Sequence, residues 1–273
     1  PYVLNLIDTP GHVDFTYEVS RALAACEGAV LLVDASQGVE AQTIANYYLA
    51  TESKLKIIPV INKIDLSSAD TEEAGKQIKE VLQISDKPAQ VSAKLGTGVE
   101  NLLRRIVLEV PSPKPIIKKT AALVFDSFYD TYRGVIIYLR MFGGSISKGD
   151  KIVFLGTGKK YEVLEIGWWQ LKFKPESPLN DGETGYIICG IKNIHDVKIG
   201  DTITLENDPA DKPLGGFKET KPFVFAGFYP SNAADYENLK HAIEKLQLTD
   251  ASFRSFPESS SALGTGFRCG FLG

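Results

Sequence analysis

Three short polar segments carry the side chains that a nucleotide site needs: Asp8-Thr9-Pro10-Gly11-His12, Asn62-Lys63-Ile64-Asp65 and Ser92-Ala93-Lys94. In the first segment, Asp8 offers a carboxylate to Mg²⁺, which proteins bind through few carboxylates and several waters. Gly11 has no Cβ, so its backbone N–H can approach a phosphate closely. The competing interpretation of this segment alone is an ordinary Pro-Gly turn with a capping aspartate.

The second and third segments point to the base of the nucleotide. A carboxylate such as Asp65 can accept paired hydrogen bonds from the N1–H and the exocyclic amine of guanine, a donor pair that adenine lacks. Asn62 and the stem of Lys63 would shape the ring pocket, and backbone N–H groups of Ser92–Lys94 would cap the base oxygen. An Asn-Lys-x-Asp run is weak alone, but the three segments in this order predict a guanine-nucleotide site.

The elements that position these segments alternate between strands and helices. Apolar runs at Tyr2–Ile7, Ala29–Val33, Ile57–Ile61 and Ala89–Val91 are predicted strands, and each polar segment directly follows one of them. The run Ala29–Val33 is predicted to be buried on both faces. Such alternation predicts an α/β fold with a mostly parallel sheet, whose ligands bind outside the carboxyl ends of the strands. Asp70 and Glu73 form a predicted capping pair for one of the helices.

The chain changes character after a linker punctuated by Pro111, Pro113 and Pro115. From Thr120 to Leu205, short β-branched and aromatic runs separated by glycine turns predict a small all-β antiparallel barrel. Beyond a second Pro/Gly break, a strand, an amphipathic helix and a further strand predict the opening of an α+β domain.

Composition excludes several classes of protein. The 273 residues carry a net charge of −4, too acidic for a chain that coats nucleic acid without sequence preference. The three cysteines are far apart, which excludes a disulfide framework and a common zinc site. No apolar run approaches the length of a membrane span. Met141 is the only methionine, so the chain is predicted to be an internal fragment.

The three motifs together resemble those of translational GTPases, and longer phrases narrow the resemblance to the LepA (elongation factor 4) family, including its organellar members. These phrases are Asp8–Phe15, Tyr17–Arg21, Ala25–Gly28, Val33–Thr43, Phe125–Ser127, Tyr132–Val135, Gly185–Ile188, Val224–Gly227 and Gly266–Gly273. Factors of the elongation factor G and BipA types share the first motif but differ in most later phrases. The resemblance covers the whole chain, which is under half of a typical family member.

The resemblance implies a fold and a set of domains. Residues 1–112 would be the C-terminal part of a P-loop GTP-binding domain, and residues 113–208 the β-barrel second domain. Residues 209–273 would be a linker and the truncated start of an α+β, ferredoxin-like third domain.

The resemblance also implies residue roles for GTP and Mg²⁺ as the ligands. Asp8 resembles the aspartate near Mg²⁺, holding it through water, and Gly11 resembles the γ-phosphate sensor. His12 resembles the catalytic histidine that orients the attacking water on the ribosome. Asn62, Lys63 and Asp65 resemble the guanine readers. The rest of the three segments would line the GTP site.

The function implied is ribosome-dependent GTP hydrolysis in translation, with ribosomes carrying tRNA as the partner. It would serve back-translocation, fidelity or rescue under stress, and hydrolysis would drive release from the ribosome. A monomer is expected, in the bacterial cytoplasm and at most peripheral on the inner membrane. The alternative locations are the mitochondrial matrix or inner membrane and the chloroplast stroma.

One departure from the family pattern leaves alternatives open. The sequence contains no G-x-x-x-x-G-K-[ST] segment, whose backbone and lysine cradle the phosphates. This segment and the switch I threonine are expected upstream of Pro1, so the chain alone is predicted to be inactive. The alternatives are another translational GTPase, of the elongation factor G or BipA type, and a non-catalytic ribosome- or RNA-binding module.

Overall fold

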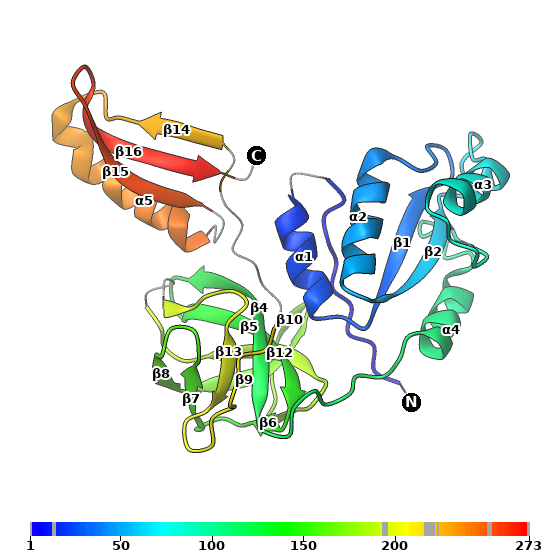
Figure 1. Cartoon of the computed structure of the whole chain (residues 1–273), viewed down its shortest axis with the longest axis horizontal. Helices are drawn as coiled ribbons and strands as arrows, with labels where there is room; N and C mark the ends of the chain where they lie inside the picture. The colour runs from blue at the N-terminus through cyan, green and yellow to red at the C-terminus, as the bar shows by residue number, and fades with distance from the viewer. Residues whose placement is uncertain are drawn as a thin grey trace. The chain divides into compact units, whose positions relative to one another are not determined.

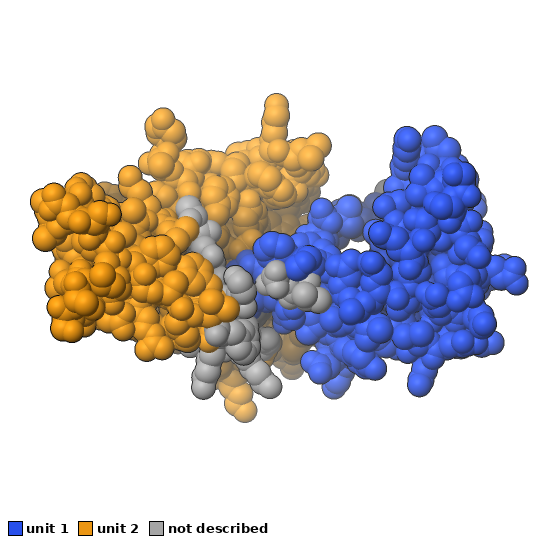
Figure 2. Space-filling model, turned by 90° about the horizontal axis from the view of Figure 1, so that it is seen from above, with its two compact units in different colours: residues 1–113 blue, residues 114–273 orange. Residues whose placement is uncertain are grey.

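The chain divides into two compact units, Pro1–Pro113 and Lys114–Gly273 (Figures 1 and 2). The structure is a computed structural model that describes residues 2–12, 15–192, 196–215, 222, 224–249 and 253–271. The domain boundaries predicted after residues 112 and 208 stay predictions, and the first of them lies next to this division.

The first unit is built on a parallel sheet in the order β1-β2-β3, with helices in the connections between the strands (Figure 1). The predicted alternation of strand and helix is therefore confirmed from α1 onward. The elements are α1 (Thr16–Ala24), β1 (Gly28–Asp34), α2 (Ala41–Glu52), β2 (Lys56–Asn62), α3 (Thr71–Val81), β3 (Ala89–Gln90) and α4 (Val99–Glu109).

Alternate side chains of β2 bury against helices on opposite faces of the sheet. Ile61 packs with Ala74 and Ile78 of α3. Ile58 and Val60 belong to a separate cluster that α4 covers with Leu102 and Ile106. The predicted cap of α3 is present, because the Asp70 carboxylate accepts a 2.9 Å hydrogen bond from the Glu73 N–H.

Strand β1 differs from its prediction on one face. Leu31 and Val33 are buried, but Leu32 is 56% exposed and Val30 is also exposed. The prediction that this run is buried on both faces is wrong. The physical reason is that α4 packs on β2 and β3, and in the described part of the chain no helix packs on the alternate side chains of β1.

The predicted first strand, Tyr2–Ile7, is also wrong. This segment has no regular structure, and Leu6 is 91% exposed. A strand persists through hydrogen bonds to a neighbouring strand, and the segment joins none of the described sheets. Asp8 therefore does not follow a strand, whereas the two later motifs do.

The second unit begins with the barrel predicted from Thr120 to Leu205. One sheet runs in the order β10-β9-β12-β5-β4-β13-β7-β8 with antiparallel pairs throughout, and β11 and β6 form a separate two-stranded antiparallel sheet. A large cluster of buried side chains that includes Ile137, Leu139 and Phe154 fills its interior. The strands are β4 (Ala121–Asp130), β5 (Gly134–Gly143), β6 (Ser145–Ile146), β7 (Lys151–Phe154), β8 (Lys160–Glu162), β9 (Glu165–Gln170), β10 (Lys172–Pro175), β11 (Leu179–Asn180), β12 (Thr184–Ile188) and β13 (Thr202–Leu205).

The last part of the chain is the α+β segment that the sequence predicts. Its antiparallel sheet has the order β14-β16-β15, and α5 lies along one face of it (Figure 1). Ile243 of α5 packs there against Phe253, Phe267 and Cys269. The elements are β14 (Val224–Phe228), the short helix η3 (Ala233–Asp235), α5 (Tyr236–Thr249), β15 (Arg254–Ser260) and β16 (Gly264–Phe271).

Candidate functional site

The loops that follow β2 and β3 form a polar site at the carboxyl edge of the parallel sheet. β1 and β2 end together, since Asp34 lies opposite Asn62 in their ladder. The chain leaves β2 through Lys63, whose φ of +63° is left-handed and strained for a residue with a Cβ. That turn lets Ile64 join the buried cluster around Ile61, so the polar loop is anchored from below by an apolar contact.

Asp65 is held by the loop after β3. The hydroxyl of Ser92, which is fully buried, donates a 2.6 Å hydrogen bond to Asp65 Oδ1. The same hydroxyl oxygen accepts a hydrogen bond from the Leu95 N–H at 3.2 Å. The bond from Ser92 holds the pKa of the Asp65 carboxyl below its usual range, and the nearby Lys94 charge adds to this. Asp65 is therefore an ionised carboxylate with one of its two oxygens already fixed.

Asn62 makes the second connection between the two loops. Its Oδ1 accepts a 3.0 Å hydrogen bond from the Ala93 N–H. This bond fixes which end of the amide points at the backbone, and the amide NH₂ is the end left to donate elsewhere. The structure thus brings Asn62 and Asp65 together with Ser92 and Ala93, as the sequence predicts.

Lys63 makes a contact that the sequence did not reveal. Its Nζ lies 2.6 Å from Asp34 Oδ2 at the end of β1. The other oxygen of Asp34 accepts hydrogen bonds from the Ser36 N–H at 2.8 Å and the Ser36 hydroxyl at 2.7 Å. Burial raises the pKa of Asp34, but the bonds from Lys63 and Ser36 outweigh it and lower this pKa to about 2. The only feature of the sequence that pointed to this contact is that the strand β1 ends in an aspartate, Asp34.

The segment Asp8–His12 is anchored differently. The Gly11 carbonyl accepts a 3.1 Å hydrogen bond from the Asn46 side chain of α2. The His12 carbonyl accepts a 3.1 Å hydrogen bond from the Phe15 N–H. The exposed imidazole ring of His12 meets the Phe15 ring edge to face. A Cβ built on Gly11 would meet nothing within 4 Å. The backbone at Gly11 is therefore open to the approach of a phosphate. Thr9 and Pro10, the two residues before it, have no regular structure.

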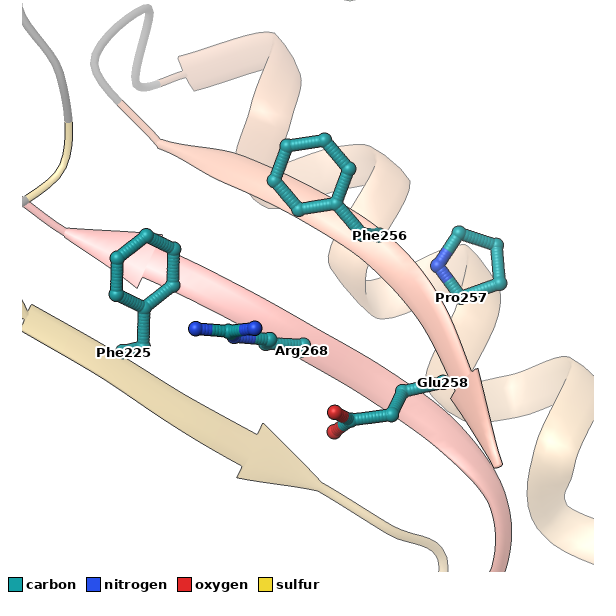
Figure 3. A pocket seen from close by; sticks show the side chains of 5 residues that line it. All are labelled: Phe225, Phe256, Pro257, Glu258 and Arg268. Atoms are coloured by element: carbon teal, nitrogen blue, oxygen red, sulfur yellow. The ribbon is translucent and has the colours of Figure 1, made fainter. Parts of the chain in front are cut away.

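A metal centre and a surface pocket are two further features that could form a site outside the three motifs. Within the part of the chain that the structure describes, no group of three or more His, Cys, Asp and Glu side chains could hold a metal ion. A pocket of about 420 Å³ lies on the open face of the β14-β16-β15 sheet (Figure 3). It is lined by Phe225, Phe256, Pro257, Glu258 and Arg268, none of which belongs to the three predicted nucleotide-binding segments.

Among the described residues, no helix combines the length and the apolar composition that a membrane span requires.

Comparison with known proteins gives matches along the whole chain. Residues 1–112 match the model of the elongation factor Tu GTP binding domain, and residues 134–204 match that of elongation factor Tu domain 2. A curated protein of Prochlorococcus marinus subsp. pastoris named elongation factor 4 is 54% identical over 274 residues, which is 100% of this chain and 46% of the relative. A relative of the same name from Chlorobium limicola is 53% identical and is covered over 45% of its length.

The chain thus spans a little under half the length of the curated relatives that it matches. A solved structure from Thermus thermophilus superposes with a TM-score of 0.72, covering 97% of this chain and 53% of that one. At 17% sequence identity this likeness concerns the fold alone.

Proposed function

Because this chain belongs to the LepA, or elongation factor 4, family of translational GTPases, we propose that the full-length protein containing it binds GTP and hydrolyses it on the ribosome. The observation that supports this most directly is the fixed Asp65 carboxylate, bonded to Ser92 beside an Asn62 that is bonded to Ala93. A pocket that did not read guanine would have no need for an ionised carboxylate held in this way.

The base is read by residues of the two loops. Asp65 accepts from the N1–H and the exocyclic amine of guanine, while Asn62 and the stem of Lys63 border the ring. Ile64 anchors their loop by packing against the buried cluster around Ile61. The backbone of Ser92, Ala93 and Lys94 caps the base oxygen.

The phosphate end is served by the segment Asp8-Thr9-Pro10-Gly11-His12. Asp8 is a single exposed carboxylate, which fits a water-mediated contact to Mg²⁺ because this ion keeps most of its own waters. When bound, Mg²⁺ neutralises charge on the phosphates. Gly11 presents open backbone to the γ-phosphate. His12 is the catalytic residue that orients the attacking water, acting by position and electrostatics rather than as a simple base.

The partner is the ribosome carrying tRNA, and the outcome is back-translocation, fidelity or rescue of translating ribosomes under stress. Hydrolysis of GTP drives the release of the protein from the ribosome. The protein acts as a monomer in the bacterial cytoplasm, peripheral on the membrane at most, or in the matching organellar compartment. The identity of 53–54% to relatives named elongation factor 4 favours this type over the elongation factor G and BipA types.

The chain by itself is proposed to be inactive. Its 273 residues contain no G-x-x-x-x-G-K-[ST] segment to cradle the α- and β-phosphates. If the full-length protein also lacked this segment, the non-catalytic binding module would be the better account.

The test is GTP hydrolysis by the full-length protein with and without ribosomes, with ATP as the matched control substrate. Stimulation by ribosomes with GTP alone supports the proposal. Equal rates with and without ribosomes, or hydrolysis of ATP at the same rate, would contradict it. Incubation with post-translocation ribosomes then separates the types, since the proposed back-translocation predicts that the tRNAs move backward.

A further inference from the structure

Asp34 lies outside the three nucleotide-binding motifs, yet its carboxylate is bound on both oxygens at the edge of the site. Ser36 donates to Oδ1 from its N–H and its hydroxyl, at 2.8 Å and 2.7 Å. The Lys63 ammonium lies 2.6 Å from Oδ2. The side chain of Asp34 is only 14% exposed, whereas that of Lys63 is 55% exposed. A nearly buried anion therefore fixes the end of an otherwise solvated lysine.

The backbone fixes the relative placement of the two residues. Asp34 ends β1 opposite Asn62, the residue before Lys63, in the parallel ladder. The Ala35 N–H donates to the Asn62 carbonyl at 2.9 Å, which ties the strand ends together one residue further on. The turn after Asp34 is closed by the Gly38 N–H, which donates to the Asp34 carbonyl at 2.9 Å. Asp34 is thus held in a fixed position beside Lys63, which leaves its strand with a left-handed backbone.

Lys63 needs such support because its side chain is long and flexible. A free lysine loses rotamer freedom when a ligand orders it, and this loss weakens binding. An exposed ion pair ordinarily gives little, since both partners must be ordered. Here the two bonds from Ser36 have already ordered the carboxylate, so the pair orders Lys63 alone.

We propose that Asp34 is a positioning residue for guanine-nucleotide binding, holding Lys63 by its ammonium so that the lysine stem is already ordered when the purine ring arrives. This inference rests on the proposed function. Asp34 touches no nucleotide itself and acts only through Lys63. The stem contacts the ring rather than the exocyclic amine, so the contribution of Asp34 is the same for guanine and for hypoxanthine.

The experiment measures equilibrium Kd values for GDP and IDP with the full-length protein, by competition against a fluorescent guanine nucleotide. The variants are Asp34→Ala, Lys63→Ala and the double variant. Asp34→Asn is added because its amide oxygen can keep the Ser36 bonds while the ion pair is lost. Asp86→Ala is the matched control, because it removes an ion pair of the same kind, 2.9 Å from Lys56, in the same unit.

Asp34→Ala and Asp34→Asn are expected to raise both Kd values roughly five- to tenfold, with an unchanged GDP-to-IDP ratio. On the Lys63→Ala background, Asp34→Ala should add nothing further. In ligand-free protein, acylation of Lys63 relative to Lys54 should rise in Asp34→Asn, because the ion pair that holds the Lys63 ammonium is lost.

If Asp34→Asn binds GDP as tightly as Asp86→Ala does, or if the effects of Asp34→Ala and Lys63→Ala multiply, the inference is overturned while the proposed function stands. If the wild-type protein binds neither GDP nor GTP, the proposed function fails and the inference with it. Should Asp34→Ala not fold, Asp34→Asn alone decides between these outcomes.

Discussion

The Ser92 hydroxyl donates a 2.6 Å hydrogen bond to Asp65 Oδ1, although 27 positions separate the two residues in the chain. Ser92 is fully buried at the end of the β3 region, and Asp65 lies in the loop after β2. The bond keeps the pKa of Asp65 below its usual range. It makes the loop after β3 a support for the carboxylate that would read the base.

Ser92→Ala is expected to raise the Kd for GDP of the full-length protein roughly tenfold, the scale of one charge-assisted hydrogen bond. The physical reason is that Asp65 loses its only side-chain donor from the β3 loop. Calorimetric titration with GDP measures the change. Ser68→Ala, at an exposed serine of the same unit, is the control, and equal Kd values for the two variants would contradict the account.

Acid should remove the stabilisation that Asp34 provides. The pKa of Asp34 is lowered in the fold from 3.8 to about 2, so its contribution is fully present above 3.8 and is lost as pH falls toward about 2. We expect Asp34→Asn to be less stable than wild type by about 1 kcal/mol near neutral pH, after allowance for solvent screening. Urea unfolding at several pH values should show this difference shrinking between pH 4 and pH 2. A difference that grows toward acid would contradict the prediction.

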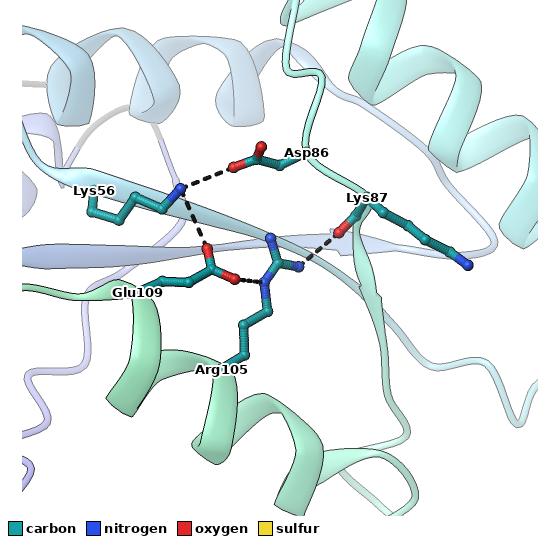
Figure 4. A network of polar contacts seen from close by, with 5 residues as sticks. All are labelled: Lys56, Asp86, Lys87, Arg105 and Glu109. Carbon is teal, nitrogen blue, oxygen red and sulfur yellow. Dashed lines mark hydrogen bonds and ion pairs between the residues drawn. The ribbon is translucent and has the colours of Figure 1, made fainter.

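A polar network ties the amino end of β2 to the loop before β3 and to the end of α4 (Figure 4). The Lys56 ammonium lies 2.9 Å from Asp86 and 3.3 Å from Glu109. Arg105 pairs with Glu109 and donates to the Lys87 carbonyl at 2.7 Å. The hydrogen bond between Lys56 and Asp86 lowers the pKa of the Asp86 carboxyl and raises the pKa of the Lys56 ammonium.

Lys56→Met is therefore expected to destabilise the first unit by about 0.2–1 kcal/mol, the range typical of solvent-exposed ion pairs. High salt should reduce the difference from wild type because these charges are screened. Thermal unfolding at low and high salt provides the measurement. Arg104→Met, which removes the more exposed pair with Glu100, is the control and should change the melting temperature less.

How far the sequence predicts the structure depends on whether the contacts are local. The cap of α3 is confirmed because Asp70 and Glu73 are near neighbours, and the barrel because its turn residues and strand patterns repeat. The pairing of Ser92 with Asp65 was predictable in outline, since parallel strands end at one edge of a sheet. Its hydrogen bond was not, because hydroxyl partners depend on the tertiary fold.

Two features escaped prediction for the same reason. Tyr2–Ile7 has the apolar pattern of a strand, but the pattern does not supply the neighbouring strand that must pair with it. Asp34 reads as an ordinary strand end, because only the folded sheet shows Lys63 reaching it. Which residues share an edge could be inferred from the sequence, whereas which of them touch could not.

His12→Ala is expected to leave the Kd for GTP unchanged and to reduce ribosome-stimulated hydrolysis roughly 100- to 1,000-fold, because a water-positioning group is lost. The backbone bond from Phe15 to the His12 carbonyl survives the substitution, so the turn should persist. Single-turnover hydrolysis on ribosomes gives the rate. His241→Ala, at an exposed histidine of α5, is the control, and full stimulation in His12→Ala would remove His12 from this role.

The most direct test of the central claim is the base specificity of Asp65→Asn in the full-length protein. An amide keeps an oxygen acceptor and can accept the Ser92 bond, but its NH₂ group meets the exocyclic amine of guanine as donor against donor. Xanthine, which carries an oxygen at that position, matches it instead. The Kd values for GDP and XDP, measured side by side with Asp86→Asn as the control, should therefore invert from a guanine to a xanthine preference. Unchanged preference for GDP in Asp65→Asn would contradict the assignment of this site as a guanine reader.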